Sequence, residues 1–204
     1  TRADGSGGTY QLTGPPFDEF QPTWSPRGDL VAFASTRGSG TDVWTVPRMR
    51  GAWRNLTNDG AAYSPSWSPD GRLIAYVSQK YGTPDIFTVE VNTLAKKLVV
   101  GDPSEDIDPT WRPDSRAIAF ASDRDGDFDI YTIGLAGGAP HNVTNTSHRD
   151  VHPVFAPDGS RIAFETHRSD VFGDVYDMFP SGSTQWPLPN QLGPEIADIQ
   201  PDWR

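Results

Sequence analysis

Apolar and polar residues alternate along short segments of this chain. In residues 85–91, Phe87, Val89 and Val91 alternate with polar side chains, which is the period-2 pattern of a half-buried β-strand. Other apolar runs, such as residues 73–77, are short and end near glycine or proline. Both of these residues are costly inside a helix. The pattern therefore predicts an all-β chain built from short strands.

One eight-residue segment recurs along the chain, and its second copy reads Ser-Pro-Ser-Trp-Ser-Pro-Asp-Gly at residues 64–71. The aromatic residue in this segment returns at spacings of 43, 44, 44 and 48 residues. Its positions are Trp24, Trp67, Trp111, Phe155 and Trp203. An Ala-aromatic pair, an Asp-aliphatic-aromatic triplet and a closing Leu-Thr-type pair keep the same phase in each unit. These landmarks in register define an internal repeat.

Each unit is predicted to form four short strands, with Pro-Asp-Gly as a tight turn between the first and second. Four strands in about 45 residues is the size of one propeller blade. We therefore predict one all-β domain over residues 1–204, a β-propeller of four-stranded antiparallel blades. The complete blades are expected at residues 20–57, 63–100, 107–144 and 151–193, and partial ones at 1–13 and 198–204.

The repeat Pro-x-Trp-Ser-Pro-Asp-Gly, followed by Ile-Ala-Phe, Ser-x-Arg-x-Gly, Asp-Ile-Tyr and Leu-Thr, resembles the TolB-like β-propeller repeat over nearly the whole chain. Residues 111–144 match it most closely, and the fourth unit departs most, with Phe155-Ala156 in place of Trp-Ser. Such repeats occur in periplasmic TolB, in the propellers of prolyl-oligopeptidase-type enzymes and in bacterial envelope proteins. The resemblance implies a ring of six blades.

Four blades and fragments of a fifth would leave such a ring open. Stacked repeats normally cover the apolar face of a terminal unit with a neighbour or a cap. We therefore expect a longer native chain, and the alternative is a partner that covers the gap.

Composition and charge exclude several classes of protein. The net charge is −10, and the 17 lysines and arginines are scattered, so no basic stripe is present to bind nucleic acid. No run of apolar residues approaches the ~20 needed to span a membrane. The chain has no cysteine, which excludes disulfides and thiolate chemistry.

The sequence offers no catalytic constellation. His152, one of four histidines, occupies a repeat position that Gln21, Ser64 and Asp108 hold in the other units, which favours a structural role. A Gly-x-Ser-x-Gly nucleophile motif and a phosphate-binding glycine loop are absent from the sequence. We therefore predict that these residues do not form an enzyme.

The most acidic segment contains Asp123, Asp125 and Asp127, which are candidate ligands for Ca²⁺ because that ion prefers several oxygen ligands. The spacing does not fit an EF-hand, and the sibling segments are not rich in acids, so a solvated hairpin loop is the competing interpretation. Asp129 is a repeat position and is expected to bond local backbone amides. No other cofactor is predicted.

A second acidic feature lies three residues before the repeat prolines. The residues are Glu19, Asp106, Asp150 and Asp198, with Ala62 in the second unit. Equivalent positions fall on a circle in a propeller, so these side chains are expected on loops near one mouth of the central channel. There they could attract a basic peptide or a cation. The competing interpretation is an ordinary exposed acidic loop.

The fourth unit carries a longer segment near residues 185–192, which includes Trp186. An exposed tryptophan among prolines, on a loop of a rigid scaffold, suggests a contact with a partner. A tolerated surface insertion is the alternative.

Taken with the resemblance, these features predict a non-enzymatic scaffold that binds other proteins, in the periplasm or otherwise outside the cytoplasm. It could serve as an accessory subunit of a bacterial envelope or membrane complex. The alternatives are the propeller domain of a prolyl-oligopeptidase-like hydrolase and a propeller that binds calcium or another ligand. This choice rests on the family, because a fold alone does not give a function.

Overall fold

The computed structural model describes residues 11–49, 51–168 and 173–188. These residues form four antiparallel sheets of four strands each, and each sheet is a simple meander. The first two sheets are β1 (Glu19–Trp24), β2 (Leu30–Ser35), β3 (Asp42–Pro47) and β4 (Arg54–Asn55), then β5 (Ala62–Trp67), β6 (Leu73–Ser78), β7 (Asp85–Glu90) and β8 (Lys96–Val100). The other two are β9 (Asp106–Trp111), β10 (Ala117–Ser122), β11 (Asp129–Gly134) and β12 (His141–Asn142), then β13 (Asp150–Phe155), β14 (Ile162–Thr166), β15 (Asp174–Met178) and β16 (Trp186–Pro187).

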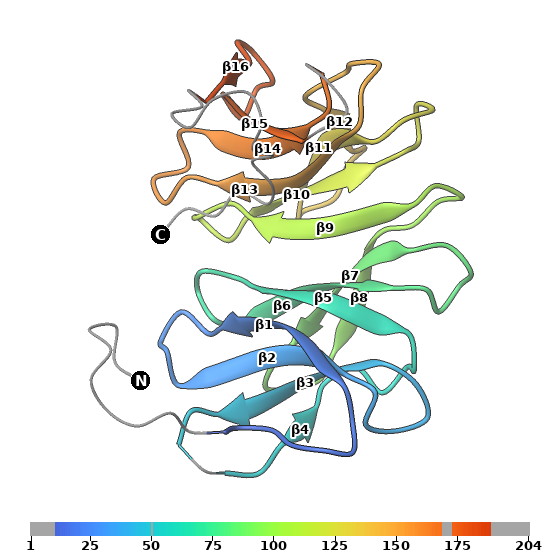
Figure 1. Ribbon diagram of the computed structural model, residues 1–204, viewed down its shortest axis with the longest axis vertical. Helices are drawn as coiled ribbons and strands as arrows, with labels where there is room; N and C mark the ends of the chain where they lie inside the picture. The colour runs from blue at the N-terminus through green and yellow to red at the C-terminus, as the bar shows by residue number, and fades with distance from the viewer. Residues whose placement is uncertain (1–10, 50, 169–172, 189–204) are drawn as a thin grey trace.

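The sheets follow one another through the molecule in chain order, from the blue end to the orange end in Figure 1. The first strand of each sheet contacts the first strand of the next, so that β1, β5, β9 and β13 lie in sequence along the inner edge. This is the arrangement of blades in a propeller. The predicted all-β fold of four-stranded blades is confirmed.

The hydrophobic core lies between neighbouring sheets. Trp67 of the second sheet packs in one cluster with Ala32, Val43 and Leu56 of the first. Trp111 packs in the same way with residues of the second sheet, and Phe155 with residues of the third. We call the side of a sheet that carries the repeat aromatic residue its aromatic face. The opposite side, which accepts the next sheet's aromatic residue, is its receiving face.

The Pro-Asp-Gly segments form the predicted turns between the first and second strands. In the second sheet the Gly71 N–H donates to the Ser68 carbonyl oxygen at 2.8 Å, and Gly71 has a φ of 72°. Glycine adopts such a positive φ without steric cost. The turn therefore fixes the register of the two innermost strands in each sheet.

The predicted partial blades fall mainly outside the described part of the chain, which omits residues 1–10 and 189–204. Within that described part, no helix is long and apolar enough to cross a membrane.

Candidate functional site

The inner strands line a cavity of about 360 Å³ at the centre of the sheets. Each sheet contributes a residue with a φ near 50° to the cavity wall, and these residues are Gln21, Ser64, Asp108 and His152. The strand register shifts at each of these four places. Such β-bulges re-aim a side chain. The repeat therefore presents one variable side chain per sheet to the channel.

Neighbouring bulge residues bond to one another across the sheets. The Gln21 side-chain amide donates from Nε2 to Ser64 Oγ at 2.8 Å. Its Oε1 accepts a hydrogen bond from the Ser64 backbone N–H at 2.9 Å. These two bonds join the first and second sheets at the channel wall.

His152 joins the third and fourth sheets at the same level. Its Nδ1 lies 2.8 Å from Glu165 Oε2, and its Nε2 lies 3.4 Å from Asp108 Oδ2. Burial raises the pKa of Asp108, and the neighbouring His152 opposes that shift. The imidazole therefore bridges two carboxylates from different strands, an arrangement consistent with the structural role inferred for His152.

Glu165 is a departure from the repeat. It is buried on β14, where the other sheets carry Ala34, Val77 and Ala121. A second histidine, His167, places its Nε2 3.3 Å from Glu165 Oε1. The fourth sheet thus has the carboxyl group of Glu165 where the other three sheets have apolar side chains. The imidazoles of His152 and His167 both contact this carboxyl group.

Three of the four predicted channel-mouth acids lie at strand starts and pair with arginine. Arg124 Nη2 lies 2.7 Å from Asp106 Oδ1, and Arg168 Nη2 lies 2.7 Å from Asp150 Oδ2. Glu19 pairs with Arg37 at 3.3 Å. Asp106 and Asp150 are fully buried at the first residue of a strand rather than on a loop, so the competing interpretation of these two carboxylates as an ordinary exposed acidic loop is wrong.

Each acid precedes its arginine by 18 residues, a spacing that the sequence analysis missed. The guanidinium that pairs with the carboxylate also contacts aromatic rings. For example, the Arg124 guanidinium lies 4.7 Å from the centre of the Tyr131 ring. In the second sheet, Ala62 occupies the position of the acid and Lys80 that of the arginine. Both members of the pair are therefore replaced in the same sheet. The fourth predicted acid, Asp198, lies outside the described residues, and a ligand-binding role for these acids stays a prediction.

Two of the three candidate calcium ligands accept hydrogen bonds from other residues of the third blade. Asp125 accepts a hydrogen bond from the Tyr131 hydroxyl, and Asp123 Oδ1 accepts one from the Glu105 N–H at 2.8 Å. Asp127 follows Asp125 by two residues. Within the described ranges, no three His, Cys, Asp or Glu side chains are grouped so as to hold a metal ion. Calcium binding by this loop stays a prediction.

Asp129 bonds the backbone that follows the fourth strand, as expected. Its Oδ1 accepts hydrogen bonds from Thr144 Oγ1 at 2.8 Å and from the Thr146 N–H at 3.0 Å. Its Oδ2 accepts one from Asn142 Nδ2 at 2.8 Å. Asp42 makes the equivalent bonds in the first sheet. The Asn-x-Thr ending of these repeats is therefore part of the blade structure.

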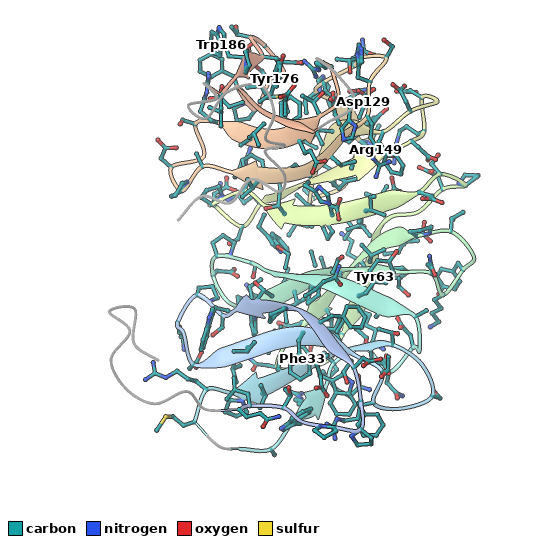
Figure 2. All side chains as sticks on the ribbon, in the orientation of Figure 1. Phe33, Tyr63, Asp129, Arg149, Tyr176 and Trp186 are labelled. Carbon is teal, nitrogen blue, oxygen red and sulfur yellow. The ribbon has the colours of Figure 1, made fainter. Side chains whose placement is uncertain are left out.

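Trp186 lies at the outer edge of the fourth sheet, at the end of the molecule opposite Phe33 in Figure 2. It belongs to the short strand β16 and pairs with Asp177. The Arg161 guanidinium lies 4.5 Å from the centre of the Trp186 ring and 4.4 Å from that of Phe179. Trp186, Phe179 and Leu188 are exposed, and we call these three residues with Arg161 the Trp186 patch.

Two solved structures of TolB-type proteins are similar to this chain. A protein from Agrobacterium tumefaciens assigned as a TolB matches with a TM-score of 0.76 and 23% identity, over 82% of this chain and 63% of its own. TolB from Acinetobacter baumannii matches with a TM-score of 0.73 and 22% identity, over 85% of this chain and 43% of its own. The chain thus spans between two fifths and two thirds of these two proteins. At these identities the likeness shows the fold.

An enzyme contains a similar propeller. A puromycin-hydrolyzing peptidase from Mycobacterium tuberculosis matches with a TM-score of 0.75 and 21% identity, over 92% of this chain and 33% of its own. The curated proteins gave no match. Residues 61–188, more than half of the chain, match the family model of the TolB beta propeller domain. The chain therefore belongs to the TolB β-propeller domain family.

Proposed function

We propose that this chain is a non-enzymatic scaffold that binds other proteins outside the cytoplasm, as an accessory subunit of a bacterial envelope or membrane complex. The observation that carries the proposal is the Trp186 patch, in which two exposed aromatic residues and an exposed leucine lie near the last strand of the fourth sheet, with the partly buried Arg161 against the two rings. Tryptophan and arginine dominate the energetically important positions of protein interfaces. Family membership and the similarity to two TolB-type structures support the same choice.

The Trp186 patch is held in place before any partner binds. Arg161 Nε donates to Asp177 Oδ2 at 2.7 Å, which fixes the guanidinium beside the rings of Trp186 and Phe179. The two rings meet edge to face, with centroids 6.0 Å apart. A surface ordered in advance loses less side-chain entropy on binding. The patch is therefore suited to hold a partner with little rearrangement.

Site-specific photocrosslinking in the bacterial host tests this proposal. A photoreactive residue at position 186 should give one discrete crosslinked protein, whereas the same residue at Met49, which is 75% exposed in the first sheet, should give none. With the captured partner purified, Trp186→Ala should weaken binding by at least about 30-fold, the effect of losing a central interface aromatic residue. Met49→Ala should leave the affinity unchanged. Equal crosslinking at both positions would contradict the proposal.

The location is tested separately by fractionation of the host. The proposal expects the protein either in the periplasmic fraction, where it is protected from added protease only while the outer membrane is intact, or in the outer-surface fraction, where it is cleaved in intact cells. Recovery in the cytoplasmic fraction alone would contradict it.

A propeller domain of a peptidase-like hydrolase is the second candidate. It is favoured by the similarity to the Mycobacterium tuberculosis peptidase, which extends over 92% of this chain. A fluorophosphonate probe for activated serine, applied to the native protein in its host, separates the two candidates. Labelling of the native polypeptide would favour the hydrolase, and the scaffold proposal expects none.

A further inference from the structure

One buried carboxylate of the second sheet lacks the partners that its counterparts have. Asp85 begins β7 as Asp42 begins β3 and Asp129 begins β11, and all three residues are at most 3% exposed. Asp42 and Asp129 each accept hydrogen bonds from an asparagine amide, a threonine hydroxyl and a backbone N–H. Among the described residues, Asp85 Oδ1 has no hydrogen-bond partner. Burial raises the pKa of Asp85, although the backbone N–H of Asp102 acts in the opposite direction.

The two missing side-chain donors are replaced by apolar residues on β8. Leu98 occupies the strand position of the asparagine, and Val100 follows it where the other two sheets have the threonine. Neither side chain can donate a hydrogen bond. A buried carboxylate oxygen without a donor is costly. The second sheet therefore keeps the carboxylate of the repeat but has lost the side chains that satisfy it.

Asp85 lines an open cavity of about 510 Å³, formed by the loop between β6 and β7 together with β8 and the residues that follow it. Tyr81 and Leu98 give this cavity an apolar wall and are 67% and 43% exposed. Asp102 lies at the same cavity, but its Oδ2 is 3.2 Å from Arg124 Nη2 and is therefore already paired. We call Tyr81, Asp85, Leu98 and Asp102 the Asp85 pocket. It combines an unpartnered carboxylate oxygen with an exposed aromatic ring and an exposed aliphatic side chain.

We propose that the Asp85 pocket binds a primary ammonium group on a short alkyl chain, the chemistry shared by a lysine side chain and a free diamine. The ammonium group offers three N–H donors, and the terminal torsion of an aspartate is soft enough for either carboxylate oxygen to turn toward the cavity. The alkyl chain packs on Leu98 and Tyr81, in the way that lysine stems cover apolar surface. The Tyr81 ring also attracts a cation, and Lys80 Nζ already lies 5.7 Å from its centre.

A guanidinium and a metal ion fit this pocket less well. A guanidinium pairs with a carboxylate through a planar fork to two oxygens, whereas Oδ1 is the oxygen of Asp85 that lacks a donor. Calcium takes six to eight oxygen ligands. Within the described part of the chain, no three His, Cys, Asp or Glu side chains are grouped so as to hold a metal ion.

The site is separate from the proposed scaffold function. The Asp85 pocket belongs to the second sheet and the Trp186 patch to the fourth, and Figure 1 shows β8 in the middle part of the molecule and β16 at one end. Failure of amine binding would therefore leave the crosslinking experiment at position 186 unaffected, and the reverse also holds.

NMR titration of the unmodified chain with n-pentylamine tests the proposal, at about pH 8, where the amine is still protonated. The amide signals of Gly82, Gly101 and Asp102, which line the cavity, should shift and saturate. Uncharged n-pentanol should bind at least about 10-fold more weakly, because it cannot form a charged hydrogen bond with Asp85. Asp85→Asn should weaken binding of the amine by a similar factor. Met49→Ala, a change at an exposed residue of the first sheet, should leave it unchanged.

The double variant Leu98→Asn with Val100→Thr gives the sharpest comparison. It supplies the two donors that Asn55 and Thr57 give to Asp42 in the first sheet. Asp85 should then be satisfied within its own sheet, and binding of n-pentylamine should fall by at least about 10-fold. The midpoint of thermal unfolding should be no lower than that of the unmodified chain, which shows that the loss of binding is not a loss of fold.

Two further probes distinguish the sources of the ammonium group. Tighter binding of Nα-acetyl-lysine methylamide would identify a lysine side chain as the ligand, and tighter binding of the diamine cadaverine would identify a free diamine. Equal binding of n-pentylamine and n-pentanol would overturn the proposal. Signal shifts confined to other parts of the molecule, or undiminished amine binding by the folded double variant, would overturn it as well.

Discussion

At the scale of single residues, Asp129 and Asp106 are both buried carboxylates, but their partners differ. Asp129 accepts hydrogen bonds from two side chains and one backbone N–H. Asp106 faces the guanidinium of Arg124. The Asp129 carboxylate is satisfied by neutral hydrogen-bond donors near the fourth strand of its own sheet. The Asp106 carboxylate depends instead on the positive charge of Arg124, whose side chain is itself largely buried. The two residues should therefore respond differently to substitution and to pH.

Asp129→Ala should destabilise the protein by on the order of 3 kcal/mol, because it leaves the Thr146 N–H and the buried Thr144 hydroxyl without their acceptor. Urea unfolding provides the measurement. Glu105, an exposed acid just before the first strand of the same sheet, provides the matched control, and Glu105→Ala should change stability by less than about 0.5 kcal/mol. Similar losses of stability for the two variants would show that the hydrogen bonds of Asp129 contribute nothing specific.

Asp106→Asn tests the effect of burial on ionisation. Burial raises the pKa of Asp106 from 3.8 to about 6, even though Arg124 acts in the opposite direction. The protonated carboxyl is therefore favoured by folding, and its contribution to stability is complete below pH 3.8 and lost as pH rises through about 6. Between pH 4 and pH 7 the free energy of unfolding of the unmodified protein should fall by up to about 3 kcal/mol relative to that of the variant. A difference that stays constant with pH would contradict the raised pKa.

At the scale of the strand pairs, each complete acid–arginine pair joins the start of the first strand to the residues just after the second. The pair is present in three sheets as Glu19 with Arg37, Asp106 with Arg124 and Asp150 with Arg168. The second sheet has a buried Ala62 and an exposed Lys80 instead. Because the second sheet lacks the acid–arginine pair, introducing the pair there measures how much it contributes to stability.

Ala62→Asp alone should destabilise the second sheet by about 3–5 kcal/mol, because it buries a carboxylate without its partner. Adding Lys80→Arg should recover at least about 1 kcal/mol of that loss, which a double-mutant cycle detects as coupling. Lys80→Arg by itself should have little effect, since Lys80 is exposed. Zero coupling in urea unfolding would mean that the 18-residue spacing does not specify the pair.

At the scale of the whole molecule, strands and turns could be predicted because their signals are local. Alternation over residues 85–91 and the Pro-Asp-Gly turns depend on neighbours in sequence, and the strand and the turns are found in the structure, although β7 is buried on both faces rather than half-buried. The burial of Asp106 and Asp150 could not be predicted from position in the repeat, because burial depends on the arginines that fold back over them. The spacing of those arginines was a usable signal in the sequence.

The channel residues show a second limit of sequence reasoning. Gln21, Ser64, Asp108 and His152 all precede proline and all adopt a positive φ, a conformation that non-glycine residues seldom take. Residue propensity gives no hint of it, because none of the four residues is a glycine. Trp186 was expected on a loop for a related reason: β16 is only two residues long and ends in proline, which gives no strand pattern.

Hydroxyl-radical footprinting of the tryptophans in dilute solution tests the central claim most directly, which is that the second and third sheets bury their repeat tryptophans against the preceding sheet while Trp186 stays exposed for a partner. Trp24 and Trp186 are 54% and 43% exposed, whereas Trp67 and Trp111 are buried. The account predicts rapid oxidation of Trp24 and Trp186 and strong protection of Trp67 and Trp111. Protection of Trp186 equal to that of Trp111 would contradict it.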